Sequence, residues 1–140
     1  MPRFYRSMLN DNGKPVVGAD TNMLGVRVPP HGHPDIVPDV DGNVHRETGG
    51  LSVVPTWRDL PYFLIPKRLK PIIHDARGKN ELACFGFGEG SFAQSSITDE
   101  LILKPDSPRH ATIQPSMPMP LGRFQQLIAE TRFGWKVDET

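Results

Sequence analysis

Apolar and polar residues alternate in several short runs along this chain, a pattern typical of half-buried β-strands. The clearest run covers residues 51–54 and directly follows the pair Gly49 and Gly50. It places the hydroxyl of Ser52 on the face opposite its apolar neighbours. A double glycine permits a sharp turn or the close approach of another group, where a Cβ atom would clash. Residues 47–57 therefore predict a turn and a strand with one polar position, which is either a tolerated serine in a core strand or part of a site.

Further strands are expected where apolar and β-branched residues cluster between turn-forming residues. These places are residues 3–9, 44–45, 71–75, 82–87, 100–105 and 109–115. In the last of them one face carries His110, Thr112 and Gln114, and the other face carries Ala111 and Ile113. A sheet with one polar and one apolar face fits the lining of a site, and it fits any half-solvated sheet as well.

Residues 121–133 form the clearest expected helix, because apolar residues recur there at helical spacing on one face. We expect this face to pack against the core. The chain of 140 residues also contains 15 prolines and 13 glycines, which favours short strands and long ordered loops. Its length is that of one domain with a core of its own. The sequence therefore predicts a single α+β domain, residues 1–140, with few helices.

The charge balance bears on the kind of partner. Sixteen Lys and Arg residues match sixteen Asp and Glu residues, so no strong positive excess points to nucleic acid or to an anionic membrane. The basic group at 67–70 is short, and we interpret it as a solvated loop. No apolar run approaches the roughly 18 residues of a membrane span, and the N-terminus lacks the apolar core of a signal peptide. Cys84 is the only cysteine, so it forms no internal disulfide and is expected to be buried.

Three places in the chain offer candidate chemistry. Arg6 lies on an expected strand among aromatic residues, so its guanidinium is either an anion clamp or a surface group on a long apolar stem. Loop 29–42 contains two histidines and three aspartates, but no second cluster has ligand spacing. We therefore expect no metal site, and a proline-ordered loop that borders a cleft instead. Glu89 is a carboxylate between glycines, either part of a site or an exposed loop charge.

Three segments in a fixed order carry a family resemblance. They are FYRS near the N-terminus, TGGLSV in the middle and RHATIQPSMPMPLGRFQQLIAET near the end. Together they resemble the Tse-two-type family of bacterial type VI secretion effector toxins, which have an ADP-ribosyltransferase-like fold and fungal relatives. The stretch PDIVPDVDGNV is similar to a further region of that family. The resemblance covers about residues 3–133, and the order of the short motifs gives it its specificity.

The resemblance implies a fold of two small twisted antiparallel β-sheets around a cleft, with a few short helices. It implies a toxin that acts inside cells as an NAD-dependent mono-ADP-ribosyltransferase, releasing nicotinamide and modifying an unknown target. Delivery by type VI secretion would take it from the cytoplasm of the producing cell to that of the target cell without a signal peptide. The producing cell would need a cognate immunity protein, which we expect to cover the cleft. No membrane partner is implied, and nucleic acid is not favoured.

The resemblance also assigns roles to individual residues. Arg6 matches the first-motif arginine, which would bind the pyrophosphate of NAD. Ser52 matches the hydroxyl at the start of the central strand, which would order the ribose and a carboxylate. Gly49 and Gly50 beside it, and Gln114 on the late strand, are the further expected NAD contacts.

The chain departs from active transferases at the late strand. Those enzymes place a glutamate there, whereas this chain offers His110, Thr112 and Gln114. His110 either acts on a leaving group or a phosphate, or is a structural histidine. Glu89 is the candidate carboxylate, although it lies outside any matching motif. Two other classes stay open: a nucleotide- or RNA-directed enzyme, such as one that removes an RNA 2′-phosphate, and a non-enzymatic toxin or binding module.

Overall fold

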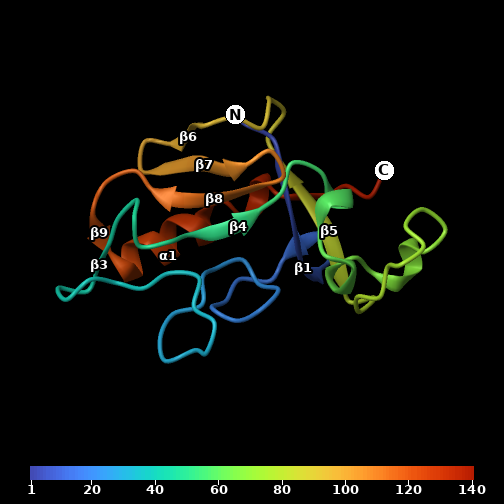
Figure 1. Ribbon diagram of the computed structural model, residues 1–140, viewed down its shortest axis with the longest axis horizontal. Helices are drawn as coiled ribbons and strands as arrows, with labels where there is room; N and C mark the ends of the chain where they lie inside the picture. Colours follow the sequence, from blue (N-terminus) through green and yellow to red (C-terminus); the bar gives the residue numbers. More distant parts are fainter.

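The computed structural model describes residues 1–140 and consists mainly of antiparallel β-strands with one short α-helix (Figure 1). The strands are β1 (Phe4–Asp11), β2 (Lys14–Pro15), β3 (Asn43–Val44), β4 (Leu51–Val53), β5 (Leu82–Phe87), β6 (Ser95–Thr98), β7 (Leu101–Ser107), β8 (His110–Pro115), β9 (Met119–Pro120) and β10 (Lys136–Val137). The helices are α1 (Leu121–Glu130) and the 3₁₀ turns η1 (Trp57–Asp59), η2 (Tyr62–Leu64), η3 (Lys67–Leu69) and η4 (Arg132–Gly134). None of them has the length and apolar character needed to cross a membrane.

The strands form two larger sheets that join into a curled half-barrel. One sheet has the order β10-β5-β1-β2 and the other β4-β8-β7-β6, while β3 and β9 form a separate pair. The two sheets meet where Tyr5 of β1 and Val54 after β4 exchange backbone hydrogen bonds of 2.7 and 2.9 Å. In Figure 1, β1 and β5 accordingly lie to one side of β4, β7 and β8. The expected α+β class with antiparallel sheets is confirmed.

Helix α1 covers the apolar face of the β4-β8-β7-β6 sheet. Its residues Phe124, Leu127 and Ile128 are buried in the main hydrophobic cluster together with Ile113 of β8. This confirms the expected packing face of the helix. The helix ends at Glu130 rather than at residue 133, because the chain continues into the 3₁₀ turn η4.

Six of the expected strands are confirmed within one or two residues, as β1, β3, β4, β5, β7 and β8. The expected strand at 71–75 is wrong. The amides of Ile72 and Ile73 both donate to the carbonyl of Leu69, at 2.9 and 2.8 Å, so the chain turns there instead of extending. The pattern also failed to indicate β6, which contributes only one buried side chain.

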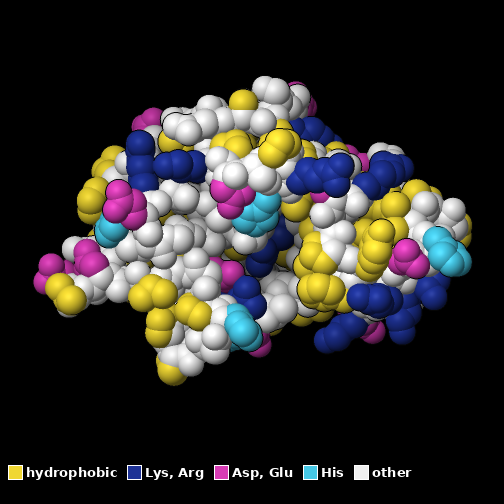
Figure 2. All heavy atoms as spheres, in the orientation of Figure 1, with side chains coloured by type: hydrophobic (Ala, Val, Ile, Leu, Met, Phe, Trp, Pro, Cys, Tyr) yellow, Lys and Arg dark blue, Asp and Glu magenta, His cyan; other side chains and the backbone are white.

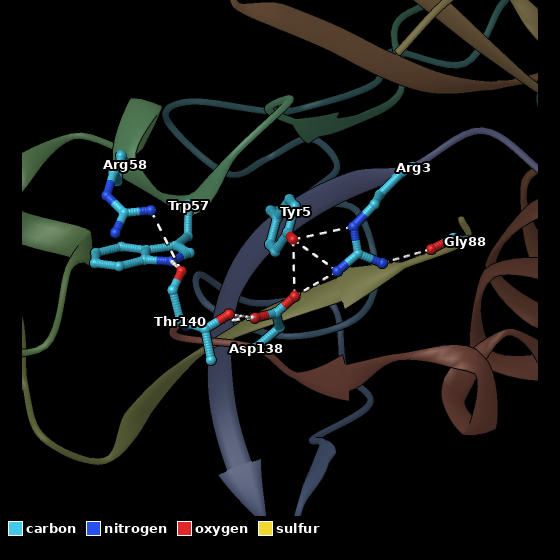
Figure 3. A network of polar contacts seen from close by, with 7 residues as sticks. All are labelled: Arg3, Tyr5, Trp57, Arg58, Gly88, Asp138 and Thr140. Carbon is cyan, nitrogen blue, oxygen red and sulfur yellow. Dashed lines mark hydrogen bonds and ion pairs between the residues drawn. The ribbon is translucent and has the colours of Figure 1, made fainter. Parts of the chain in front are cut away.

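The C-terminal residues clamp the N-terminal strand (Figure 3). The Asp138 carboxylate accepts hydrogen bonds from Arg3, from the Tyr5 hydroxyl at 2.8 Å and from the Thr140 hydroxyl at 2.7 Å. The indole of Trp57 donates to the Thr140 carbonyl at 3.1 Å. The tail thereby ties β1 to η1. Hydrogen bonds from Thr140 and Tyr5 outweigh partial burial and hold the pKa of Asp138 below its ordinary value.

We expect Asp138→Asn to lower the free energy of unfolding at neutral pH by about 1.5–3 kcal/mol, the usual contribution of a hydrogen bond to a charged group. A depressed carboxyl pKa in the folded state contributes stability above the ordinary pKa and loses it as the pH falls through the folded value. The difference between the two proteins should therefore shrink as the pH falls below the ordinary carboxyl pKa and through the lower folded pKa of Asp138. A series of urea unfolding curves from neutral to acid pH measures it.

Asp99→Asn is the matched control, because Asp99 is exposed and forms no ion pair. A variant difference at Asp138 that persists unchanged at acid pH would contradict the role of its charge.

Candidate functional site

A pocket of about 320 Å³ lies where β1 meets β4, and we call it the cationic pocket. Its walls come from β1, β4, the start of β8, the loop after β2 and the segment after η1. The side chains that line it are Arg6, Ser7, Thr21, Asn22, Arg27, Asp35, Ser52, Val53, Val54, Leu60, Pro61, Phe63, Leu64 and His110. Figure 2 shows the hollow near the centre of this face, with basic, acidic and histidine side chains around it. Its volume is at the low end of the ~300–1,000 Å³ typical of ligand sites.

Arg6 links two segments of the pocket wall by hydrogen bonds to their backbone carbonyls. Its Nη1 donates to the carbonyl of Ser52 at 2.9 Å, and its Nη2 donates to the carbonyl of Met23 at 3.2 Å. Its Nε is buried without a partner. Burial lowers the pKa of Arg6 to about 10, so the guanidinium stays charged at neutral pH. Arg6 lines the pocket and contributes its positive charge there.

A second guanidinium in the pocket belongs to Arg27, which binds Asp35 through two side-chain contacts of 2.8 and 3.1 Å. The backbone amide of Arg27 donates to the same carboxylate at 2.8 Å. Burial raises the pKa of Asp35, but the hydrogen bonds from Arg27 outweigh it and hold the pKa below its ordinary value. Asp35 is the only carboxylate of the pocket and is paired with Arg27, whereas Arg6 has no ion pair. The pocket therefore has a net positive charge.

Ser52 and His110 complete the polar lining. Ser52 is half-buried between the buried Leu51 and Val53, as its position in the alternating run predicted. Its hydroxyl forms no hydrogen bond within the protein. At the start of β8, the Nδ1 of His110 lies 2.9 Å from both carboxylate oxygens of Asp106. Because Nδ1 faces a carboxylate, the Asp106 contact orients the ring and leaves Nε2 without a protein partner.

The structure brings Arg6, Ser52 and His110 into one pocket, but the other expected site residues lie outside its lining: Gly49, Gly50, Glu89 and Gln114. Glu89 lines a different cavity with Arg3, Phe133 and Lys136 and faces none of the residues of the cationic pocket. Gln114 lies farther along β8 and outside the pocket lining; its Nε2 donates to the Thr112 hydroxyl at 2.8 Å. The Gln114 amide oxygen is buried without a partner.

The two glycines before Ser52 serve close backbone contacts. A Cβ atom at Gly49 would overlap the carbonyl of Asp35, and one at Gly50 would overlap the carbonyl of Ile113. Gly49 also has a φ of 112°, which other residues rarely adopt. Gly50 donates its amide to the Asp35 carbonyl at 3.1 Å. The pair thus fixes the Asp35 loop against the sheet, which confirms that the double glycine permits a close approach.

Sequence reasoning missed Arg27 as a pocket residue. It lies between Val26, which is buried, and Val28, which is half-buried, so the argument that singled out Arg6 on its strand applied here too. Loop 29–42 does border the cleft, as expected, through Asp35. No three His, Cys, Asp or Glu side chains are grouped so that they could hold a metal ion. Cys84 is buried as expected, and burial raises the pKa of its thiol to about 12.

Models of protein families do not match this chain, and curated protein sequences do not match it either. The interpretation of the pocket therefore rests on its geometry and on the sequence motifs.

We expect Gly50→Ala to lower the free energy of unfolding by about 2 kcal/mol, the usual cost of overpacking, since the new methyl group meets backbone rather than a movable side chain. Gly122→Ala in α1 is the matched control. A Cβ atom there meets nothing within 4 Å, so alanine should stabilise the helix by about 0.5–1 kcal/mol. Thermal and urea unfolding measure both changes. Equal stability of the two variants would contradict the tight contact at Gly50.

Proposed function

We propose that this chain is a toxin of the Tse-two type that binds NAD in the cationic pocket and transfers ADP-ribose to an intracellular target. One observation carries the proposal: Arg6, Ser52 and His110 come from three distant segments and line the same pocket. These are the residues to which the family resemblance gives roles. The curled antiparallel sheets fit the ADP-ribosyltransferase-like fold that we propose with it.

The donor set of the pocket suits a dinucleotide. A pyrophosphate needs cations and N–H donors, and the pocket offers the guanidinium of Arg6 beside that of Arg27. The hydroxyl of Ser52 has no partner in the protein and is available to a ribose. The volume of about 320 Å³ holds only part of a dinucleotide, so we expect the remainder to extend over the rim.

In this reaction NAD is a substrate that is consumed. The bond between nicotinamide and C1′ of its ribose breaks, nicotinamide leaves with the bonding electrons, and a nucleophile of the target bonds to C1′. We assign to Nε2 of His110 the role of taking the proton that the nucleophile loses, because the Asp106 contact occupies only Nδ1. Positive charge develops on the ribose as in glycoside hydrolysis. Because Asp35 is engaged by Arg27, the pocket offers no unpaired carboxylate to face that charge, and we expect slow turnover.

The same resemblance supports the cellular setting that we propose. The toxin would be delivered by type VI secretion into the cytoplasm of a target cell. A cognate immunity protein would protect the producing cell by covering the mouth of the pocket. The identity of the target does not follow from the pocket.

A second candidate is a nucleotide- or RNA-directed enzyme on this scaffold. It is favoured by the combination of Arg6, Arg27 and His110 with no unpaired carboxylate, because cations and an imidazole suit phosphate chemistry. Such an enzyme would act on an RNA phosphate and leave no ADP-ribose on a target. NAD that is radiolabelled in its adenosine part distinguishes the two, since only ADP-ribosyl transfer attaches the label covalently to the target.

We expect His110→Ala to lower the rate of nicotinamide release from NAD by about 100-fold, which is typical for loss of a general base. Its side chain forms hydrogen bonds only with the exposed Asp106, so the fold should remain intact. His74→Ala is the matched control, because His74 is exposed and lies outside the pocket. Calorimetric titration measures the affinity for NAD, and expression in a sensitive host measures toxicity. Failure of the wild-type protein to bind NAD would refute the proposal.

Ser52→Ala tests the pocket from the opposite strand. Its hydroxyl has no protein partner, so we expect unchanged stability and nicotinamide release lowered by about tenfold, the worth of roughly one hydrogen bond. Ser96→Ala, on the exposed face of β6 in the same sheet, should release nicotinamide at the wild-type rate. If folded Ser52→Ala and His110→Ala proteins were both as toxic as the wild type, the pocket would not be the active site.

A further inference from the structure

Residues 57–80 form a lobe beside the cationic pocket, and we call it the 57–80 lobe. It contains the 3₁₀ turns η1, η2 and η3, and it closes where Lys67 donates its amide to Gly78 at 3.0 Å and Gly78 donates to Ile65 at 2.8 Å. A hydrophobic cluster of its own, which includes Trp57, Leu60 and Ile65, lies beneath it. The lobe is therefore an ordered part of the fold, held by backbone hydrogen bonds and by packing on this cluster.

The lobe concentrates positive charge on a chain that is neutral overall. It carries six Lys and Arg against two Asp, which leaves ten basic against fourteen acidic residues in the rest of the chain. All six basic residues of the lobe are exposed: Arg58, Lys67, Arg68, Lys70, Arg77 and Lys79. Only Arg68 forms an ion pair, with Glu139. The lobe thus offers an excess of unpaired positive charge.

Two neighbouring aromatic rings are exposed on the same lobe. Tyr62 is 46% and Phe63 is 58% exposed, and Phe63 also lines the cationic pocket. Arg77 donates its amide to the Tyr62 carbonyl at 3.0 Å, and Arg109 shares a shallow hollow with Tyr62 and Arg58. Figure 2 shows apolar side chains gathered beside the central hollow, with Lys and Arg side chains at their edges. Aromatic faces, cations and the mouth of the pocket are therefore adjacent.

We propose that the 57–80 lobe binds single-stranded nucleic acid, with bases stacked on Phe63 and Tyr62 and phosphates held by its lysines and arginines. Exposed aromatic rings beside unpaired cations are the usual means of holding a single strand. The lobe contacts the strand at the rim of the pocket through Phe63, whichever reaction the pocket performs. The proposal therefore does not depend on the use of NAD.

Other acidic partners fit this surface less well. Half of its basic residues are lysines, which are depleted at protein–protein interfaces but common at phosphate contacts. A duplex hides its base faces in the stack, and the three-residue turns of the lobe provide no helix to enter a major groove. Single-stranded RNA and DNA share the required bases and phosphates, so both are tested.

The test is fluorescence anisotropy with labelled oligouridine and oligothymidine of about 15 nucleotides, without NAD, at about 50 mM salt. We expect Phe63→Ala to weaken binding about tenfold, the effect of losing one stacked base. Phe133→Ala is the matched control, because Phe133 is 74% exposed but lines a different cavity. The affinity of this variant for both oligonucleotides should stay at the wild-type value. Preference for either sugar supports the proposal and identifies the strand.

Charge is tested separately through the salt dependence of binding. Lys67→Ala/Lys70→Ala should reduce the slope of log affinity against log salt by about 1.4, since each contact to a single strand contributes about 0.7. Lys104→Ala/Lys136→Ala, which removes two exposed lysines outside the lobe, should leave the slope unchanged. Thermal unfolding confirms that each variant is folded.

Three results would overturn the proposal. The first is no binding of either oligonucleotide at about 100 μM wild-type protein, the weak limit of non-specific binding. The second is a duplex of equal length that binds as tightly as the single strands. The third is labelled polyglutamate that binds more tightly than the oligonucleotides and is unaffected by Phe63→Ala, which would identify an acidic protein surface as the occupant.

Discussion

The crossing of β1 and β4 determines where every other part of the site lies. Tyr5 and Val54 exchange two backbone hydrogen bonds there, and the next residue of β1, Arg6, reaches the carbonyl of Ser52 at 2.9 Å. A single register therefore joins the two sheets and places a guanidinium beside a serine. If the strands slipped by one residue, Arg6 would turn to the opposite face of β1 and the pocket would lose its charge.

Within that frame, charge is distributed unevenly on a protein whose formal net charge is zero. Arg27 neutralises the buried Asp35, so Arg6 remains as the uncompensated cation of the pocket. The same face continues into the 57–80 lobe, where most basic side chains have no acidic partner. An anionic ligand that approaches this face therefore meets a positive field that the overall charge balance conceals.

Local periodicity accounts for what the sequence could predict. Alternation around Ser52 and along β8 places these side chains on the correct faces, and helical spacing locates the buried face of α1. Membership of the pocket depends on how the sheets curl and which loops pack on them. The sequence alone therefore could not show that Arg27 and Asp35 pair across a proline-rich turn, or that Glu89 lies in another cavity. The prediction of a strand at 71–75 is wrong because the apolar residues there belong to a turn. Their backbone amides bond a nearby carbonyl of the same segment instead of a neighbouring strand.

The tail that fastens β1 also pairs with the backbone of Cys84, the residue that carries the only thiol of the protein. Asp138 donates its amide to the carbonyl of Cys84 at 2.9 Å, and Glu139 accepts from the amide of Cys84 at 3.1 Å. Because the thiol is buried and its pKa is raised, alkylating reagents react with it only when this part of the molecule opens. The side chain of Cys84 belongs to the hydrophobic cluster beneath the 57–80 lobe, with Trp57 and Ile65. The rate of cysteine labelling in native protein therefore reports the opening of that cluster, without a probe added anywhere else in the chain.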